Sequence, residues 1–270
     1  MSYLLLFLIF CFIVWLYLRF STRIPILMYH RIADIPGDRN SLPVEKFIEQ
    51  LEYLHHNGYQ TVTMNDVYMH YTKQKKLPTK SVLLTFDDGY KDNYITALPL
   101  LKKYKMSAVV FPISNWIGRE NQWEDFHKAA TLTMTLDELK SWQKNGMEIA
   151  SHTVNHPFLS TCKGSQLQAE LLESKNYLSK ELNTSIDFLC YPYGNFNKET
   201  MLIAKNVGYK AAFAIFDQVP IWHINLFALP RIQISSRQSL NEFKLKVSKI
   251  HTIFIVMRQL ERWIKNLRQK

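Results

Sequence analysis

Two adjacent carboxylates, Asp87 and Asp88, follow an apolar run and precede Gly89. The run Val82–Phe86 is typical of a short buried strand, so both acids are expected at the rim of a sheet, where ligands usually bind. Two carboxylates this close resist joint ionisation unless their roles differ, for example with a cation on one while the other handles protons. Taken alone, Asp-Asp-Gly is more often a solvated turn, so the choice depends on residues further along the chain.

Two histidines, His152 and His156, lie four residues apart after a second strand-like run. Neutral imidazoles at this spacing can bind one metal from a helix or a tight loop, and Pro157 favours a loop or a first helical turn. Taken alone, such a pair is as often two ordinary polar loop residues as a pair of metal ligands. With one Asp it makes the three-ligand set of a catalytic divalent site with open positions. Asp88 can supply that carboxylate, which leaves Asp87 as a base; the set suits zinc and also admits cobalt, nickel or iron.

A third strand-like run leads into a turn within Phe188–Gly194. Such a turn can direct a backbone N–H at a developing oxyanion and place an aromatic ring beside a sugar face, although Pro-Tyr-Gly is also a common turn. Tyr191, Pro192 and Tyr193 are therefore candidate substrate contacts. Trp123 is another, in a loop that either lines a sugar groove or packs on the surface.

These three ordered motifs, Thr85–Gly89, Ser151–His156 and Tyr191–Gly194, resemble the polysaccharide deacetylase superfamily, the NodB homology domain of carbohydrate esterase family 4. The resemblance covers residues 24–250, and three motifs in order are far more specific than any one. It implies an α/β fold, a distorted (β/α) barrel with about seven strands.

The resemblance also implies roles for individual residues. Asp87 is similar in position to the catalytic base, and the backbone N–H of Tyr193 to the oxyanion donor. Asp88, His152 and His156 correspond to the ligands of one divalent metal ion.

Two departures from the commoner family pattern stand out. The Arg that usually opens the third motif is absent, and Cys190 or its neighbours occupy that region; the late Leu-x-His is absent too, since the chain reads Leu229-Pro230-Arg231. Arg231 could supply the missing guanidinium, or form a surface salt bridge instead. His30, at the end of an early strand-like run, could supply the general acid, or be a structural strand-end histidine. An early Met-Tyr-His strand is similar to the subgroup that acts on poly-N-acetylglucosamine.

Alternating helical and strand-like segments must position these residues. Amphipathic helices are expected over residues 44–57, 93–104 and 135–145, and strands over 109–113 and 211–215. A chain of 270 residues suffices for one barrel domain. Its three cysteines show no paired spacing, so no disulfide framework is implied. The net charge of +10 comes without a basic-aromatic platform, so nucleic acid is not an expected partner.

Both ends of the chain carry features outside this domain. Residues 1–20 contain the apolar run Tyr3–Leu18 without a cleavage site, which predicts an uncleaved single-pass transmembrane helix in the cell (inner) membrane. The arginines that follow favour a cytoplasmic domain, whereas the resemblance favours the outer face, so the side stays open. Residues 251–270 predict a basic amphipathic helix that lies on the membrane or closes the barrel.

The resulting interpretation is a metal-dependent hydrolase that removes N-acetyl groups from N-acetylhexosamine residues of a polysaccharide similar to poly-N-acetylglucosamine. Two alternatives remain open: a deacetylase of a lipid-linked sugar in envelope glycan biosynthesis, and a catalytically inactive sugar-binding relative.

Overall fold

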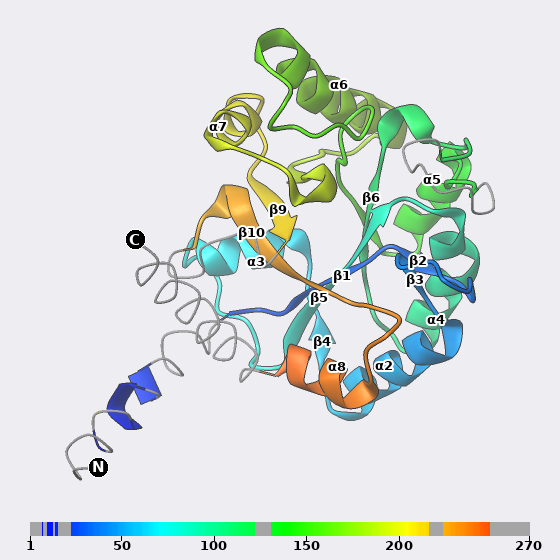
Figure 1. Ribbon diagram of the computed structural model, residues 1–270, viewed down its shortest axis with the longest axis vertical. Helices are drawn as coiled ribbons and strands as arrows, with labels where there is room; N and C mark the ends of the chain where they lie inside the picture. The colour runs from blue at the N-terminus through cyan, green and yellow to red at the C-terminus, as the bar shows by residue number, and fades with distance from the viewer. Residues whose placement is uncertain are drawn as a thin grey trace.

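The computed structural model describes residues 23–121, 131–215 and 224–248, together with positions 7, 10–12, 14 and 15. Parallel strands form a curled sheet in the order β7-β6-β5-β1-β10-β9-β8 (Figure 1). These strands are β1 (Ile26–Tyr29), β5 (Ser81–Asp88), β6 (Val109–Pro112), β7 (Glu148–Ile149), β8 (Phe188–Cys190), β9 (Ala211–Ile215) and β10 (Leu229–Gln233). The predicted barrel-like sheet of about seven strands is thereby confirmed.

The two edges of this sheet meet through a single bridge. Ser151, just after β7, pairs in parallel with Leu189 of β8. The Ser151 N–H donates to the Phe188 carbonyl (3.1 Å), and the Cys190 N–H donates to the Ser151 carbonyl (2.9 Å). The third and second motifs therefore lie side by side, although they are far apart in sequence.

Helices surround the sheet in Figure 1, with α6 and α7 at the top and α2 and α8 at the bottom. They are α2 (Val44–His56), α3 (Met64–Tyr71), α4 (Leu98–Lys103), α5 (Leu136–Lys144), α6 (Gly164–Leu182), α7 (Lys198–Asn206) and α8 (Leu240–Val247). The predicted helix over 93–104 is present but begins as a π-helical turn, Asn93–Ala97. Three short strands lie outside this strand order: β4 (Gln60–Thr61) pairs with β5, and β2 (Arg31–Ile32) pairs with β3 (Ser41–Leu42).

Strand alternation decides which side chains enter the barrel. Along β5, Leu84 and Phe86 pack in the outer core under the helices. Leu83 packs in a second, inner core with residues of β6, β8 and β9. Because side chains alternate along a strand, Asp87 lies on the same inner side as Leu83, at the carboxyl end of the strand.

The predicted terminal helices and Trp123 fall almost entirely outside the described residues. Within the described residues, no helix is long and apolar enough to cross a membrane.

Candidate active site

Asp88, His152 and His156 converge at the carboxyl ends of β5 and β7. Asp88 Oδ1 lies 3.4 Å from His152 Nε2 and 3.3 Å from His156 Nε2. All three side chains are buried, and their ligand atoms lie within 4.8 Å of one another. Asp88 Oδ1 accepts no hydrogen bond despite being buried. A buried carboxylate oxygen facing two imidazoles is a donor set that could hold a divalent metal ion.

The protonation of the two histidines supports this fit. His152 Nδ1 lies 2.9 Å from the Cys190 carbonyl oxygen, which can only accept, so Nδ1 carries the proton and Nε2 is the atom that can bind a metal. Burial lowers the pKa of His156 to about 3, which keeps that imidazole neutral. Burial also opposes the charging of His152, yet Cys190 and Asp88 raise its pKa overall. The cluster thus favours a positive charge, which a proton or a metal ion can supply.

Backbone strain concentrates at this cluster. Asp88, Thr153, His156 and Tyr193 all have left-handed φ values, of 69°, 71°, 61° and 57°. Residues other than glycine rarely adopt this region, and such strain persists only where the surroundings enforce it. Gly89 has φ +70° as well, and a Cβ there would meet Pro112 at 3.0 Å, so this turn requires glycine.

Glu170 of α6 holds the loop between the two histidines. Its Oε2 accepts from the backbone N–H groups of Val154 (3.0 Å) and Asn155 (2.9 Å), and its Oε1 accepts from Asn155 Nδ2 (2.7 Å). The His156 N–H is bound by Thr153 Oγ1 at 3.0 Å. Sequence reasoning missed Glu170, because an acid within an amphipathic helix carries no signal that it faces a loop.

Asp87 forms a bidentate pair with Arg231 of β10 on the inner side of the barrel. Arg231 Nη1 donates to Oδ1 at 2.6 Å and Nη2 to Oδ2 at 2.7 Å. Arg231 is only 1% exposed, so the alternative of a surface salt bridge is wrong. Burial opposes the ionisation of Asp87, but the Arg231 guanidinium holds the pKa of that carboxyl well below its usual range. The guanidinium therefore keeps Asp87 charged and fixes its orientation.

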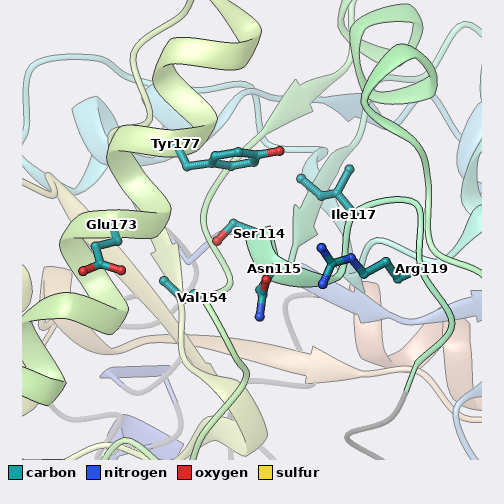
Figure 2. Close-up of a pocket in the computed structure, with 7 residues that line it drawn as sticks. All are labelled: Ser114, Asn115, Ile117, Arg119, Val154, Glu173 and Tyr177. Carbon is teal, nitrogen blue, oxygen red and sulfur yellow. The ribbon is translucent and has the colours of Figure 1, made fainter.

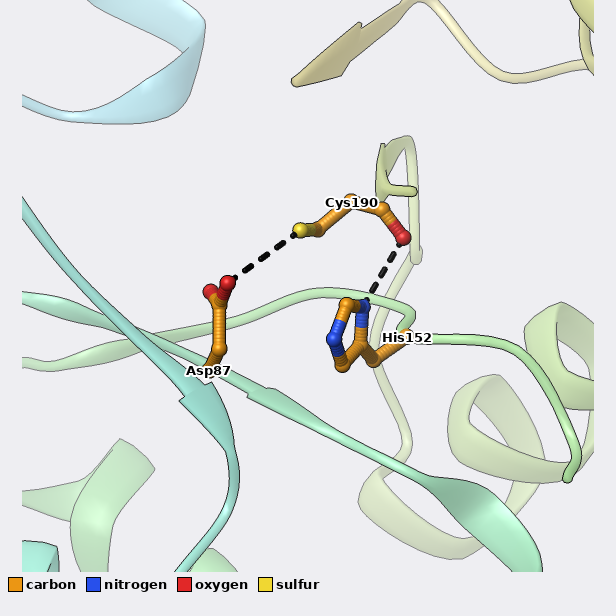
Figure 3. A group of neighbouring side chains, drawn as sticks. All are labelled: Asp87, His152 and Cys190. Atoms are coloured by element: carbon orange, nitrogen blue, oxygen red, sulfur yellow. Dashed lines mark hydrogen bonds between the residues drawn. The ribbon is translucent and has the colours of Figure 1, made fainter. Parts of the chain in front are cut away.

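Cys190 connects this pair to the cluster of Asp88, His152 and His156, which we call the metal cluster. Arg231 Nη2 lies 3.0 Å from Cys190 Sγ, and the thiol lies 3.7 Å from Asp87 Oδ2. Figure 3 shows the Cys190 thiol facing Asp87 while its carbonyl faces His152. Burial raises the pKa of the thiol, so it stays protonated beside the carboxylate. From sequence, Cys190 was noted only as standing in the region of a missing arginine.

His30 approaches Asp87 from the end of β1. Its Nε2 lies 4.0 Å from Asp87 Oδ2, and its side chain is 18% exposed. The His30 carbonyl accepts from Asn93 Nδ2 at 2.7 Å, which anchors the backbone here. Three elements far apart in sequence, β1, β5 and β10, thus bring His30, Asp87 and Arg231 together.

The third motif provides an exposed ring at Tyr193 only. Tyr193 is 38% exposed. Its ring stacks on Phe158, with the ring centroids 4.3 Å apart, and packs edge-on against the His156 ring, with the centroids 4.4 Å apart. The prediction that Tyr191 contacts substrate is wrong, because its ring is fully buried and its hydroxyl donates to the Phe227 carbonyl at 2.9 Å. Pro192 is also buried, so it too offers no surface to a sugar.

The fold and this site define a class: a parallel α/β barrel hydrolase with a candidate metal centre beside a buried, arginine-bound carboxylate. Residues 74–212 match the family model described as polysaccharide deacetylase. YxkH of Bacillus subtilis (strain 168), whose name places it with polysaccharide deacetylases, is 33% identical over 229 residues, 85% of this chain and 77% of that protein. The chain belongs to the polysaccharide deacetylase family, hydrolases that cleave N-acetyl amide bonds.

Three further similar proteins are informative. The poly-beta-1,6-N-acetyl-D-glucosamine N-deacetylase of Staphylococcus aureus (strain MRSA252) is 31% identical over 204 residues, 72% of this chain and 68% of that protein. The Streptococcus pyogenes deacetylase PplD, solved with acetate, superposes with a TM-score of 0.72 at 30% identity, covering 83% of this chain and 98% of that one. IcaB from Ammonifex degensii shares the fold, with a TM-score of 0.69 at 23% identity over 82% of this chain and 94% of that one.

Proposed function

We propose that this chain removes N-acetyl groups from a polymer of N-acetylglucosamine in a metal-dependent reaction. The observation that carries the proposal is the placement of the Asp88, His152 and His156 cluster next to Asp87, with His30 at 4.0 Å from the same carboxylate. The Staphylococcus aureus relative, named as a poly-beta-1,6-N-acetyl-D-glucosamine N-deacetylase, supports the choice of substrate.

Asp88, His152 and His156 would hold the divalent ion, most simply zinc. When bound, such an ion polarises an acetamide carbonyl and makes water more acidic. The remaining steps fall to the chain itself. Asp87, oriented by both Arg231 nitrogens, accepts a proton from the attacking water.

The leaving group needs a proton in its turn. Protonated His30 donates to the amine nitrogen as the carbon–nitrogen bond breaks, so that acetate and an amino sugar are released. Attack of water on the acetamide carbonyl places negative charge on the carbonyl oxygen. The backbone N–H of Tyr193 is our candidate donor to this oxyanion, because Tyr193 lies in a left-handed turn beside His156. The complete set of acid, base and ligands argues against an inactive sugar-binding relative.

The apolar run Tyr3–Leu18 supports a second proposal, that residues 1–20 anchor the enzyme in the cell membrane. An anchor would also suit a lipid-linked sugar as substrate. The side of the membrane is best assigned by protease accessibility of the full chain in vesicles.

Acetate release tests these proposals directly. Full-length protein would be incubated with β-1,6-linked N-acetylglucosamine polymer and, separately, with a polyprenyl-linked N-acetylhexosamine, before and after chelation and zinc addition. We expect release from the polymer, loss on chelation and recovery with zinc. A His152→Ala, His156→Ala variant that kept stoichiometric metal and full turnover would contradict the site.

A further inference from the structure

A hollow of about 350 Å³ lies between the loop after β6 and helix α6. Figure 2 shows Tyr177 and Glu173 of α6 on one side and Ile117 and Arg119 of the loop after β6 on the other. We call this hollow the α6 subsite. It is lined by Ser114, Asn115, Ile117, Arg119, Val154, Glu173 and Tyr177.

The α6 subsite lies on the same edge of the barrel as the metal cluster. Strands β6 and β7 are adjacent and parallel, so the loops at their carboxyl ends share one edge. Val154, which lines the hollow, is two residues from both His152 and His156, so its Cα lies within about 7 Å of theirs. The hollow therefore shares the loop between the two histidines with the candidate metal centre.

Helix α6 connects the hollow to the loop between His152 and His156, which we call the metal loop. Glu170 accepts the Val154 N–H at 3.0 Å, and Ser174 Oγ lies 2.8 Å from Ser151 Oγ. Tyr177 follows Glu170 by seven residues, so both lie on one face of the helix. The same face that fixes the metal loop also supplies the ring of the hollow.

The lining suits a neutral sugar ring. Tyr177 is 41% exposed and offers an aromatic face to C–H groups, while Asn115, Arg119 and Glu173 carry planar polar groups that can bind hydroxyls. Among the described residues, neither the Arg119 guanidinium nor the Glu173 carboxylate forms an ion pair or side-chain hydrogen bond. Their opposite charges balance, which favours an uncharged polyhydroxylated ligand over an anion or a cation. The volume lies in the range of small-molecule sites.

We propose that the α6 subsite binds the N-acetylhexosamine residue that flanks the one being deacetylated. This inference rests on the proposed function and deepens it, since it makes a glycan chain the preferred substrate over a single sugar. The flanking residue stacks on Tyr177, and its hydroxyls meet Asn115, Arg119 and Glu173.

The test compares a β-1,6-linked N-acetylglucosamine pentasaccharide with the monosaccharide. We expect wild-type protein to show a higher kcat/KM on the pentasaccharide. Tyr177→Ala should lower the ratio of pentasaccharide to monosaccharide kcat/KM by about 5- to 10-fold, mainly through KM, because a stacking contact is lost that is equal in ground and transition states. Tyr177→Phe, which keeps the ring, should retain most of the preference.

Leu202→Ala, at a 58% exposed position on α7, is the matched control and should leave the ratio at its wild-type value. Elemental analysis of each variant checks that metal content is retained. An unchanged ratio in Tyr177→Ala, or equal loss on both substrates, would overturn the subsite.

A failure of the proposed function has a different signature. If wild-type protein released no acetate, calorimetry of pentasaccharide binding to Asp87→Asn would still test the subsite. Weaker binding when Tyr177→Ala is added supports it, and unchanged or absent binding overturns it.

Discussion

Replacing Arg231 by methionine should disturb both stability and catalysis, because Arg231 is the buried partner of Asp87. The two side chains share two hydrogen bonds, of 2.6 and 2.7 Å, and are only 1% and 3% exposed. Methionine fills much of the same space without a charge, so Asp87 is left buried and unpaired. Removing one partner of such a pair costs about 3–5 kcal/mol. We expect the free energy of unfolding at neutral pH to fall by about that amount.

The pH dependence of this loss has a definite sign. In the wild-type protein Arg231 holds the pKa of Asp87 below its unfolded value, so the pair stabilises the fold above about pH 4 and loses its effect only as pH falls further. In Arg231→Met, burial instead raises the pKa of Asp87. The variant therefore recovers stability as pH falls through that raised pKa, and the gap from wild type narrows on acidification.

Two measurements check this reasoning, urea unfolding from pH 5 to 8 and the pH profile of kcat/KM for acetate release. The acidic limb of the profile should move up by about 1–3 pH units, since an adjacent cation lowers a carboxyl pKa by about that much. Arg237→Met, at an exposed position on the same segment, is the control. A stability loss under about 1 kcal/mol with an unmoved acidic limb would refute the role of Arg231.

Four further substitutions separate the parts of the site. Asp87→Asn should remove most turnover while leaving metal content near wild type, whereas Asp88→Asn should lose metal, as elemental analysis would show; equal metal loss in both would contradict this division. His30→Ala should keep the metal and lower kcat by about 10²–10⁴-fold, and near-normal turnover would make His30 structural. Glu170→Gln replaces an acceptor of the metal loop by an amide donor, so zinc affinity should fall by about 10–100-fold in a chelator competition. Glu181→Gln, on the same helix, is its control, and equal zinc affinity in the two variants would show that Glu170 does not position the loop.

Local patterns predicted where the chemistry of this protein lies. Acidic and histidine residues directly after apolar runs predicted ligands at the rim of a sheet, and the resemblance of the three ordered motifs to a known family implied the α/β barrel. The comparison with the family pattern suggested His30, from an early strand-like run, as the general acid and Arg231 as the missing guanidinium. In the structure, Arg231 hydrogen-bonds to Asp87, and the His30 ring lies 4.0 Å from the same carboxylate.

Other features depend on packing between distant segments. Tyr191 and Tyr193 are two residues apart in one motif, yet Tyr191 is buried and its hydroxyl donates to the Phe227 carbonyl, while Tyr193, in a left-handed turn, is exposed. No periodicity distinguishes these two outcomes, since a turn residue's direction follows from its φ value and from what packs beneath it.

Partners across the fold are likewise a tertiary property. Glu170 reaches the metal loop because α6 packs against it, and the Cys190 thiol meets Arg231 because β8 and β10 curl toward β5 around the barrel interior. A sequence states which groups can donate or accept, and strand order and helix packing decide which of them meet. The residue types of the candidate site were therefore readable in the chain, whereas the roles of Glu170 and Cys190 in holding them in position became evident only from the tertiary structure.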